Sequence, residues 1–138
     1  MIAAFWNLPQ DVSEPELKAA KAAIEMQKTM IRKVVPMWNQ AGVLRVGIGI
    51  GIHTGEVIAG NLGASQLMNY TAMGDTVFNA GKLESLARPG EILISEEMHK
   101  LVEGKVIRAD KVIKGVEFRG SKSTTNVYVL KPIDYPDY

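Results

Sequence analysis

Glycine and β-branched residues alternate through residues 46–52, and this segment constrains the fold more than any other part of the sequence. A period of two residues is that of a β-strand, in which successive side chains point to opposite faces. One face of the predicted strand carries valine and isoleucine, and the other carries only glycine. A helix, a ligand or another backbone can therefore approach the glycine face closely.

A long amphipathic helix is predicted from residue 15 to about residue 41. Ser13 and Glu16 have the spacing of a capping box at its start. Pro36 is expected to kink the helix or end it early, and Gly42 is expected to stop it. Four apolar residues at seven-residue intervals define one apolar stripe: Leu17, Ile24, Ile31 and Trp38.

Strand and helix patterns alternate along the rest of the chain. Asp75 is expected at the N-cap of one helix and Ser95 at the N-cap of a shorter one, because such side chains accept hydrogen bonds from backbone amides. The expected elements are strands at residues 2–6, 67–73 and 92–94, a short strand within the loops of residues 55–64, helices at residues 75–87 and 95–101, and a strand pair within residues 105–130.

The composition is that of one ordinary globular domain. The chain has 138 residues, 22% of them charged, and a net charge of +1 with both signs interspersed. This balance gives no electrostatic case for a nucleic-acid or membrane partner. There is no cysteine, which excludes disulfides and thiolate metal sites and fits a reducing, cytoplasmic location. No apolar run reaches the ~20 residues that a membrane span needs.

Three phrases occur along the chain in order: GIHTGEVIAGNLG, YTAMGD and LESLARPGEILIS. Together they resemble the second half of the catalytic domain of class III nucleotidyl cyclases, the adenylyl and guanylyl cyclases. The resemblance implies an α+β fold, a ferredoxin-like βαββαβ sandwich without its N-terminal part, over residues 1–131, with a tail at residues 132–138. It also implies a lyase of cyclic-nucleotide signalling, which closes a nucleoside triphosphate into a 3′,5′-cyclic monophosphate and releases pyrophosphate.

The resemblance assigns recognition of the substrate base to Thr71, in the YTAMGD phrase. The family carries Thr or Asp in this slot, and the side chain reads the purine edge. A hydroxyl can donate or accept a hydrogen bond, and Thr matches the adenine-using branch, so we expect ATP as substrate and cyclic AMP as product. The alternative is that Thr71 is present for its β propensity alone.

The segment TVFNAGKLES departs from the family pattern at the positions that carry chemistry. The family has Asn directly after Thr-Val, which orients the ribose, and Arg four residues later, which neutralises the phosphates. Here Phe78 occupies the Asn slot, Asn79 follows it, and Lys82 occupies the Arg slot. We take Lys82 and Asn79 as the candidate catalytic residues, although a shift of one residue turns Asn79 by ~100° around the helix. The alternative is that Phe78 is a core residue and Lys82 a solvated charge.

Other positions in the matched phrases are expected to have structural roles. Asp75 is expected to cap its helix rather than to catalyse. His53 is expected to be a packed, hydrogen-bonded residue rather than a base or a metal ligand. At Gln66-Leu67 an apolar residue stands where the family commonly carries Arg before the Tyr-Thr pair, which predicts either a more buried strand or a lost charge contact.

The family's chemistry uses two metal ions, Mg²⁺ or Mn²⁺, held by two aspartates. The positions that match those aspartates and a base-contacting lysine precede Met1, so we expect no metal ligand in this chain and no turnover by the chain alone. The resembled sites form between two protomers, which implies a homodimer or a complementary cyclase protomer as partner. The missing strand also leaves an open sheet edge, which favours association.

Two functions therefore remain from the sequence. The chain is either an incomplete adenylyl cyclase domain or a pseudo-cyclase module that binds a nucleotide or a partner without catalysis. A ferredoxin-like domain that binds RNA is disfavoured, because the net charge is near zero and there is no pair of aromatic, basic strands.

Overall fold

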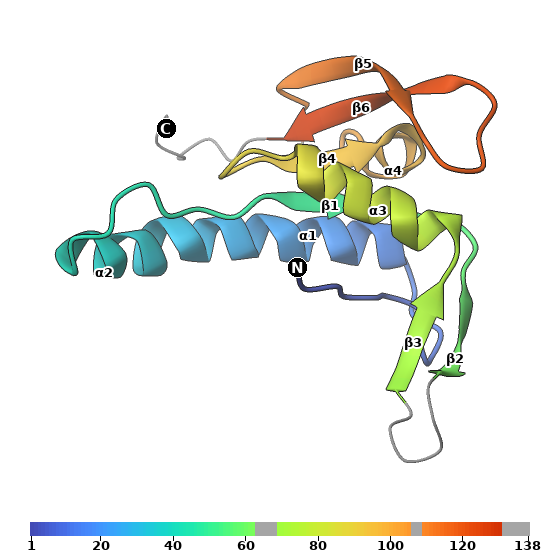
Figure 1. Cartoon of the computed structure of the whole chain (residues 1–138), viewed down its shortest axis with the longest axis horizontal. Helices are drawn as coiled ribbons and strands as arrows, with labels where there is room; N and C mark the ends of the chain where they lie inside the picture. The colour runs from blue at the N-terminus through green and yellow to red at the C-terminus, as the bar shows by residue number, and fades with distance from the viewer. Residues whose placement is uncertain (63–68, 106–108, 131–138) are drawn as a thin grey trace.

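The computed structural model describes residues 1–62, 69–105 and 109–130. Its main sheet has four strands in the order β1-β4-β6-β5, in which β1 and β4 are parallel and the other pairs are antiparallel. Helices lie against this sheet, so the predicted α+β class is confirmed (Figure 1). The strands of this sheet are β1 (Ile50–Ile52), β4 (Ile92–Ser95), β5 (Lys111–Glu117) and β6 (Thr124–Leu130).

The core lies on both faces of the sheet because the central strand β4 is buried on both sides. One cluster joins Ile92 and Ile94 to α1 (Pro15–Thr29) and α4 (Glu96–Val102). The other cluster joins Leu93 to α3 (Asp75–Leu86) and to β5 and β6. A continuous apolar run is typical of a strand covered on both faces, and residues 92–94 follow that rule.

The glycine face of β1 packs against α3. A Cβ atom built on Gly49 would lie 2.7 Å from the Ala87 carbonyl oxygen, and one built on Gly51 would lie 2.7 Å from the Ala80 carbonyl oxygen. Both separations are shorter than real carbon atoms adopt, so only glycine permits this approach. The close approach inferred from the alternating pattern is therefore confirmed, and the neighbour is a helix.

Residues 2–6 were expected to form a strand, and this expectation is wrong. The segment carries no strand assignment, and the side chains of Met1 and Ile2 are 89% and 97% exposed. A strand needs a hydrogen-bonding neighbour, and within the described part of the chain no strand pairs with this segment or with the second edge of β1.

The long helix begins at Pro15 and stays helical through Gln40, as α1, a π-helical turn η1 (Met30–Val34) and α2 (Val35–Gln40). Pro36 does not end the helix early. It is the second residue of α2, just after the π-helical turn, and a missing backbone amide is tolerated at that position. Gly42 stops the helix as predicted, with a φ of 84° and its amide bonded to the Asn39 carbonyl at 3.0 Å.

Helix caps were predicted with mixed success. The capping box of Ser13 and Glu16 does not form, because Glu14 is the N-cap of α1 and no side chain bonds to the free amides there. Asp75 is also not an N-cap: Gly74, at a φ of 129° that other residues rarely adopt, takes that position before α3. Ser95 does cap α4, its hydroxyl oxygen accepting from the Met98 amide at 3.3 Å.

A separate hairpin is formed by β2 (Ile58–Leu62) and β3 (Asn69–Met73). It extends away from the main sheet, and β3 runs directly into α3 (Figure 1). The predicted strands at residues 55–64 and 67–73 correspond to this hairpin within the described residues. Gln66, Leu67 and the predicted tail at residues 132–138 lie outside the described residues.

Candidate active-site face on helix α3

The turn between β5 and β6 is fastened to α3 by one buried side chain. Asn79 is 4% exposed, and its amide nitrogen donates to the Arg119 carbonyl at 3.0 Å. The Arg119 amide donates in return to Asn79 Oδ1 at 2.8 Å. Both polar groups of the Asn79 side chain are thus used within the fold, and the side chain points into the protein.

Phe78 lies on a different side of the same helix. Its side chain is 47% exposed, and the central carbon of the Arg119 guanidinium lies 3.7 Å from the centre of its ring. This is a cation–π contact, which holds a guanidinium flat while leaving its in-plane N–H donors free. Phe78 is therefore a platform for Arg119 rather than a core residue.

Lys82 lies one helical turn after Phe78 and also contacts the β5–β6 segment. Its ammonium donates to the Glu117 carbonyl oxygen. At the start of the helix, a Cβ built on Gly120 would collide with the Asp75 carboxylate, so Asp75 also abuts this turn. Phe78, Lys82 and Arg119 together define a surface that we call the α3 face.

The structure brings Lys82, Phe78 and Asn79 to the contact between α3 and the β5–β6 turn, but Thr71 lies elsewhere. Thr71 is in β3, opposite Gly60 of β2, and is four residues before Asp75 in sequence. No hydrogen bond among the described residues joins Thr71 to Asn79 or Lys82. The base-reading and phosphate-binding candidates are therefore on separate elements of this chain.

Arg119 is the one residue of this face that the sequence analysis did not identify. The signal was weak: an arginine followed by glycine in a turn between two strands. Only the tertiary contact across 40 positions, to Asn79, shows that its backbone is held in place.

The residues of the α3 face do not fit a magnesium or manganese site. Such ions take several oxygen ligands, mostly carboxylates, with near-octahedral geometry for magnesium. In the described ranges, no group of three or more His, Asp or Glu side chains could hold a metal ion. Asp75 abuts the β5–β6 turn beside this face, and among the described residues it belongs to no metal-binding group, so no step of a mechanism is assigned to a metal on these residues.

His53 is packed between two elements at the end of β1. Its ring centre is 5.1 Å from that of Phe118, and its Nδ1 lies 4.0 Å from Glu97 Oε2 without a hydrogen bond. Burial lowers the pKa of His53 below 6.5, and the Glu97 carboxylate opposes that change in part. The neutral imidazole is thus favoured. The predicted packing of His53 matches this geometry, whereas the predicted hydrogen bond is not made at Nδ1.

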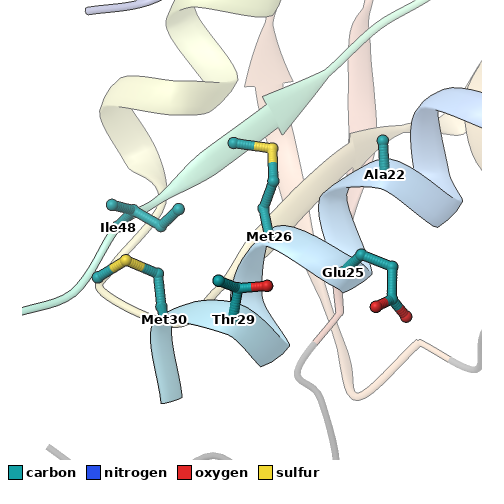
Figure 2. Close-up of a pocket in the computed structure, with 6 residues that line it drawn as sticks. All are labelled: Ala22, Glu25, Met26, Thr29, Met30 and Ile48. Carbon is teal, nitrogen blue, oxygen red and sulfur yellow. The ribbon is translucent and has the colours of Figure 1, made fainter. Parts of the chain in front are cut away.

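A pocket of about 460 Å³ lies on the opposite helix, away from the α3 face. Figure 2 shows the side chains of Met26 and Met30 directed from the long helix toward Ile48, the residue two positions before β1. The lining is mostly apolar and contains none of the predicted site residues, so the pocket does not support the candidate site.

Comparison with known proteins identifies the family. Residues 4–132 match the family described as the adenylate and guanylate cyclase catalytic domain. The chain belongs to that family. The predicted resemblance and the predicted fold are therefore confirmed.

Relatives of both specificities are similar to the chain. Two solved structures are the guanylyl cyclase Cya2, at 26% identity and a TM-score of 0.80, and the adenylyl cyclase CyaB of P. aeruginosa, at 28% and 0.75. The match to Cya2 covers 94% of this chain and 66% of Cya2. The match to CyaB covers 91% of this chain and 64% of CyaB. An uncharacterized protein of Mycobacterium bovis is 47% identical over 95 residues, 67% of this chain and 16% of that protein.

The family includes both adenylate and guanylate cyclases, so membership leaves the choice between adenine and guanine open. Curated relatives include a guanylate cyclase of Toxoplasma gondii and an adenylate cyclase of Rhizobium meliloti. The matched segment is only 2% of the length of the first protein and 12% of the length of the second. None of the helices in the described ranges is long and apolar enough to cross a membrane.

Proposed function

We propose that this domain binds a purine nucleoside triphosphate, with a preference for ATP, and that the phosphates lie on the α3 face. The observation that carries the proposal is a pair of cations, Lys82 and Arg119, at one contact between α3 and the β5–β6 turn. Neither has a carboxylate partner among the ion pairs of the described residues. Unpaired cations held at a common surface suit a polyanionic ligand.

Each residue then has a distinct role. Lys82 gives up its bond to the Glu117 carbonyl and neutralises phosphate charge as a point cation. Arg119 presents its N–H donors to phosphate oxygens from the ring of Phe78. Asn79 acts through Arg119, because both of its amide groups hold the turn. Thr71 reads the purine edge, and its place on the β2–β3 hairpin suits a site shared between two protomers.

Support for a nucleotide ligand also comes from the solved relatives. One structural neighbour is a rhodopsin-guanylyl cyclase with converted specificity in complex with ATPαS, and another is a guanylate cyclase domain in complex with GTP. Those ligands are bound by those proteins. Magnesium or manganese chemistry and a homodimeric or complementary protomer remain part of the proposal for a complete site.

The second candidate is a pseudo-cyclase module that binds nucleotide without turnover. The exchange at positions 78 and 79 favours it, because an aromatic ring occupies the exposed slot and the neighbouring amide is bonded inside the fold. A ring cannot donate a hydrogen bond to a ribose hydroxyl. We propose that the chain alone makes no cyclic nucleotide.

Competition titration with a fluorescent ATP analogue tests the binding proposal. Unlabelled ATP should displace the analogue at lower concentration than GTP does. Lys82→Ala should weaken binding by about tenfold or more, since bonds to charged groups are worth ~1.5–3 kcal/mol. Thr71→Ala should reduce the preference for ATP, while the exposed Thr29→Ala serves as control. No displacement by either nucleotide would reject the proposal, and stronger displacement by GTP would reject the assignment of adenine.

A further inference from the structure

The end of the long helix protrudes from the body of the protein. Helix α2 continues past the end of the main sheet, and the chain turns back only after it (Figure 1). Every residue from position 36 to position 45 is exposed. We call residues 36–45 the helical tip.

The helical tip presents large apolar side chains to solvent from both sides of its turn. Met37 is 60% exposed and Trp38 is 44% exposed on the helix, and Val43 and Leu44 are 40% and 73% exposed after it. The Val43 amide donates to the Trp38 carbonyl at 2.9 Å, which completes a Schellman turn at Gly42 and fixes these two residues close together. Exposed apolar side chains that gather in one place on a surface indicate an interaction site.

The sequence on both sides of the helical tip carries only positive charges. Residues 26–55 contain Lys28, Arg32, Lys33 and Arg45, and no Asp or Glu. Among the described ion pairs, only Lys28 has a partner, Glu25, and the exposed cations Arg32, Lys33 and Arg45 have none. The near-zero net charge of the whole chain concealed this local excess.

We propose that the helical tip docks on the surface of an anionic lipid bilayer. Met37, Trp38 and Leu44 would insert among the headgroups, and Arg32, Lys33 and Arg45 would lie against the lipid phosphates. Tryptophan and basic residues beside an apolar projection are the features of an interfacial anchor. The exposed apolar side chains of the helical tip come both from the end of the helix and from the turn after it, and not from a single helix face. Such an arrangement suits the surface of a bilayer better than a groove on a protein.

Vesicle binding tests this proposal directly. The chain contains two tryptophans, so Trp6→Phe leaves Trp38 as the only tryptophan, whose emission is excited selectively at long wavelength. With vesicles of 30% phosphatidylglycerol in phosphatidylcholine, we expect co-sedimentation of this variant and a blue shift of Trp38 emission. Neutral phosphatidylcholine vesicles should bind it weakly, and 0.5 M salt should reverse binding to the anionic vesicles.

Charge variants locate the binding surface. Each cation near an anionic membrane contributes about a fivefold change in partition coefficient, so Arg32→Gln with Lys33→Gln and Arg45→Gln should reduce it by about a hundredfold. The matched control removes three exposed cations elsewhere, Lys100→Gln with Lys114→Gln and Lys122→Gln, and should retain most of the binding. Circular dichroism should report unchanged helix content for both triple variants.

Three outcomes would overturn the proposal: absence of binding to anionic vesicles, equal loss in the two triple variants, or no change in Trp38 emission on binding. Sedimentation of the chain without lipid provides a further check. Dissociation of a dimer by Met37→Gln or Leu44→Gln would assign the helical tip to contact with a second copy instead.

Discussion

The pairing of Asn79 with the Arg119 backbone predicts a large loss of stability on truncation. Asn79→Ala removes two hydrogen bonds, of 3.0 and 2.8 Å, from a side chain that is 4% exposed. Each such bond contributes ~1 kcal/mol net, and a backbone group left unpaired costs ~1–3 kcal/mol where water cannot replace the partner. Arg119 itself is exposed, so water restores part of the bonding, and we expect a loss of about 2–3 kcal/mol.

Urea and thermal unfolding monitored by circular dichroism measure this loss. For a domain of this size, about 2–3 kcal/mol corresponds to a fall in Tm of about 6–12 °C. The exposed Asn39→Ala on α2 is the matched control and should stay within about 0.5 kcal/mol of wild type. Arg119→Ala retains its backbone and therefore both bonds to Asn79, and should lose only the exposed cation–π contact, about 0.5–1 kcal/mol.

The relative order of these variants decides the argument. If Asn79→Ala is no less stable than the Asn39→Ala control, the amide does not fasten the turn. If Asn79→Ala keeps its stability and abolishes nucleotide binding, Asn79 contacts the ligand directly, and the assignment of Asn79 as a positioning residue is wrong.

Three further predictions concern the site and its surroundings. The first uses a mixture with a cyclase protomer that keeps its metal aspartates but lacks its own Asn and Arg. In this mixture, Phe78→Asn with Lys82→Arg should raise cyclic-nucleotide formation over wild type, since one oriented donor is worth ~10²–10³ in rate. An equal or lower rate would contradict the slots assigned to positions 78 and 82. The lowered pKa of His53 means that the unfolded state binds more protons than the folded state, so the free energy of unfolding should fall as pH drops below about 6.5. Between pH 7.5 and 5.5, the free energy of unfolding of His53→Gln should change less with pH than that of wild type. In the same complementation mixture, Thr71→Ala should narrow the difference between ATP and GTP as substrates, and an unchanged ratio would exclude Thr71 from base recognition.

Local patterns in the sequence predicted those elements whose partners lie nearby. Gly42 ends the long helix through bonds to residues just before it, and Ser95 caps α4 through the amide three residues later. The alternating glycines predicted a close neighbour for β1 because the absence of a side chain has the same consequence in any fold. The strand at residues 2–6 failed since strand formation depends on a neighbour that the local sequence does not specify.

The caps show the same limit on a smaller scale. Asp75 has the chemistry of an N-cap, but Gly74 accepts a φ of 129° and takes that position, which moves Asp75 into the first turn. Ser13 and Glu16 have the spacing of a capping box, yet their side chains bond to Lys18 and Thr54 instead. A short motif shows which hydrogen bonds its side chains are able to make, but tertiary contacts determine which of those hydrogen bonds form.

The exchange of residues at positions 78 and 79 shows how much of the site followed from helix geometry. Consecutive residues on a helix point ~100° apart. Moving the asparagine from position 78 to position 79 therefore moves it from the exposed side of α3 to the buried side, and leaves Phe78 exposed. Helix geometry could not supply Arg119, which reaches the same helix from a turn 40 positions later. With its guanidinium stacked on Phe78 and its backbone held by Asn79, Arg119 makes the two substitutions interdependent. Phe78→Asn removes the ring that supports Arg119, whether or not position 82 is also changed. Arginine at position 82 is therefore needed to supply the bidentate cation that Arg119 would no longer present.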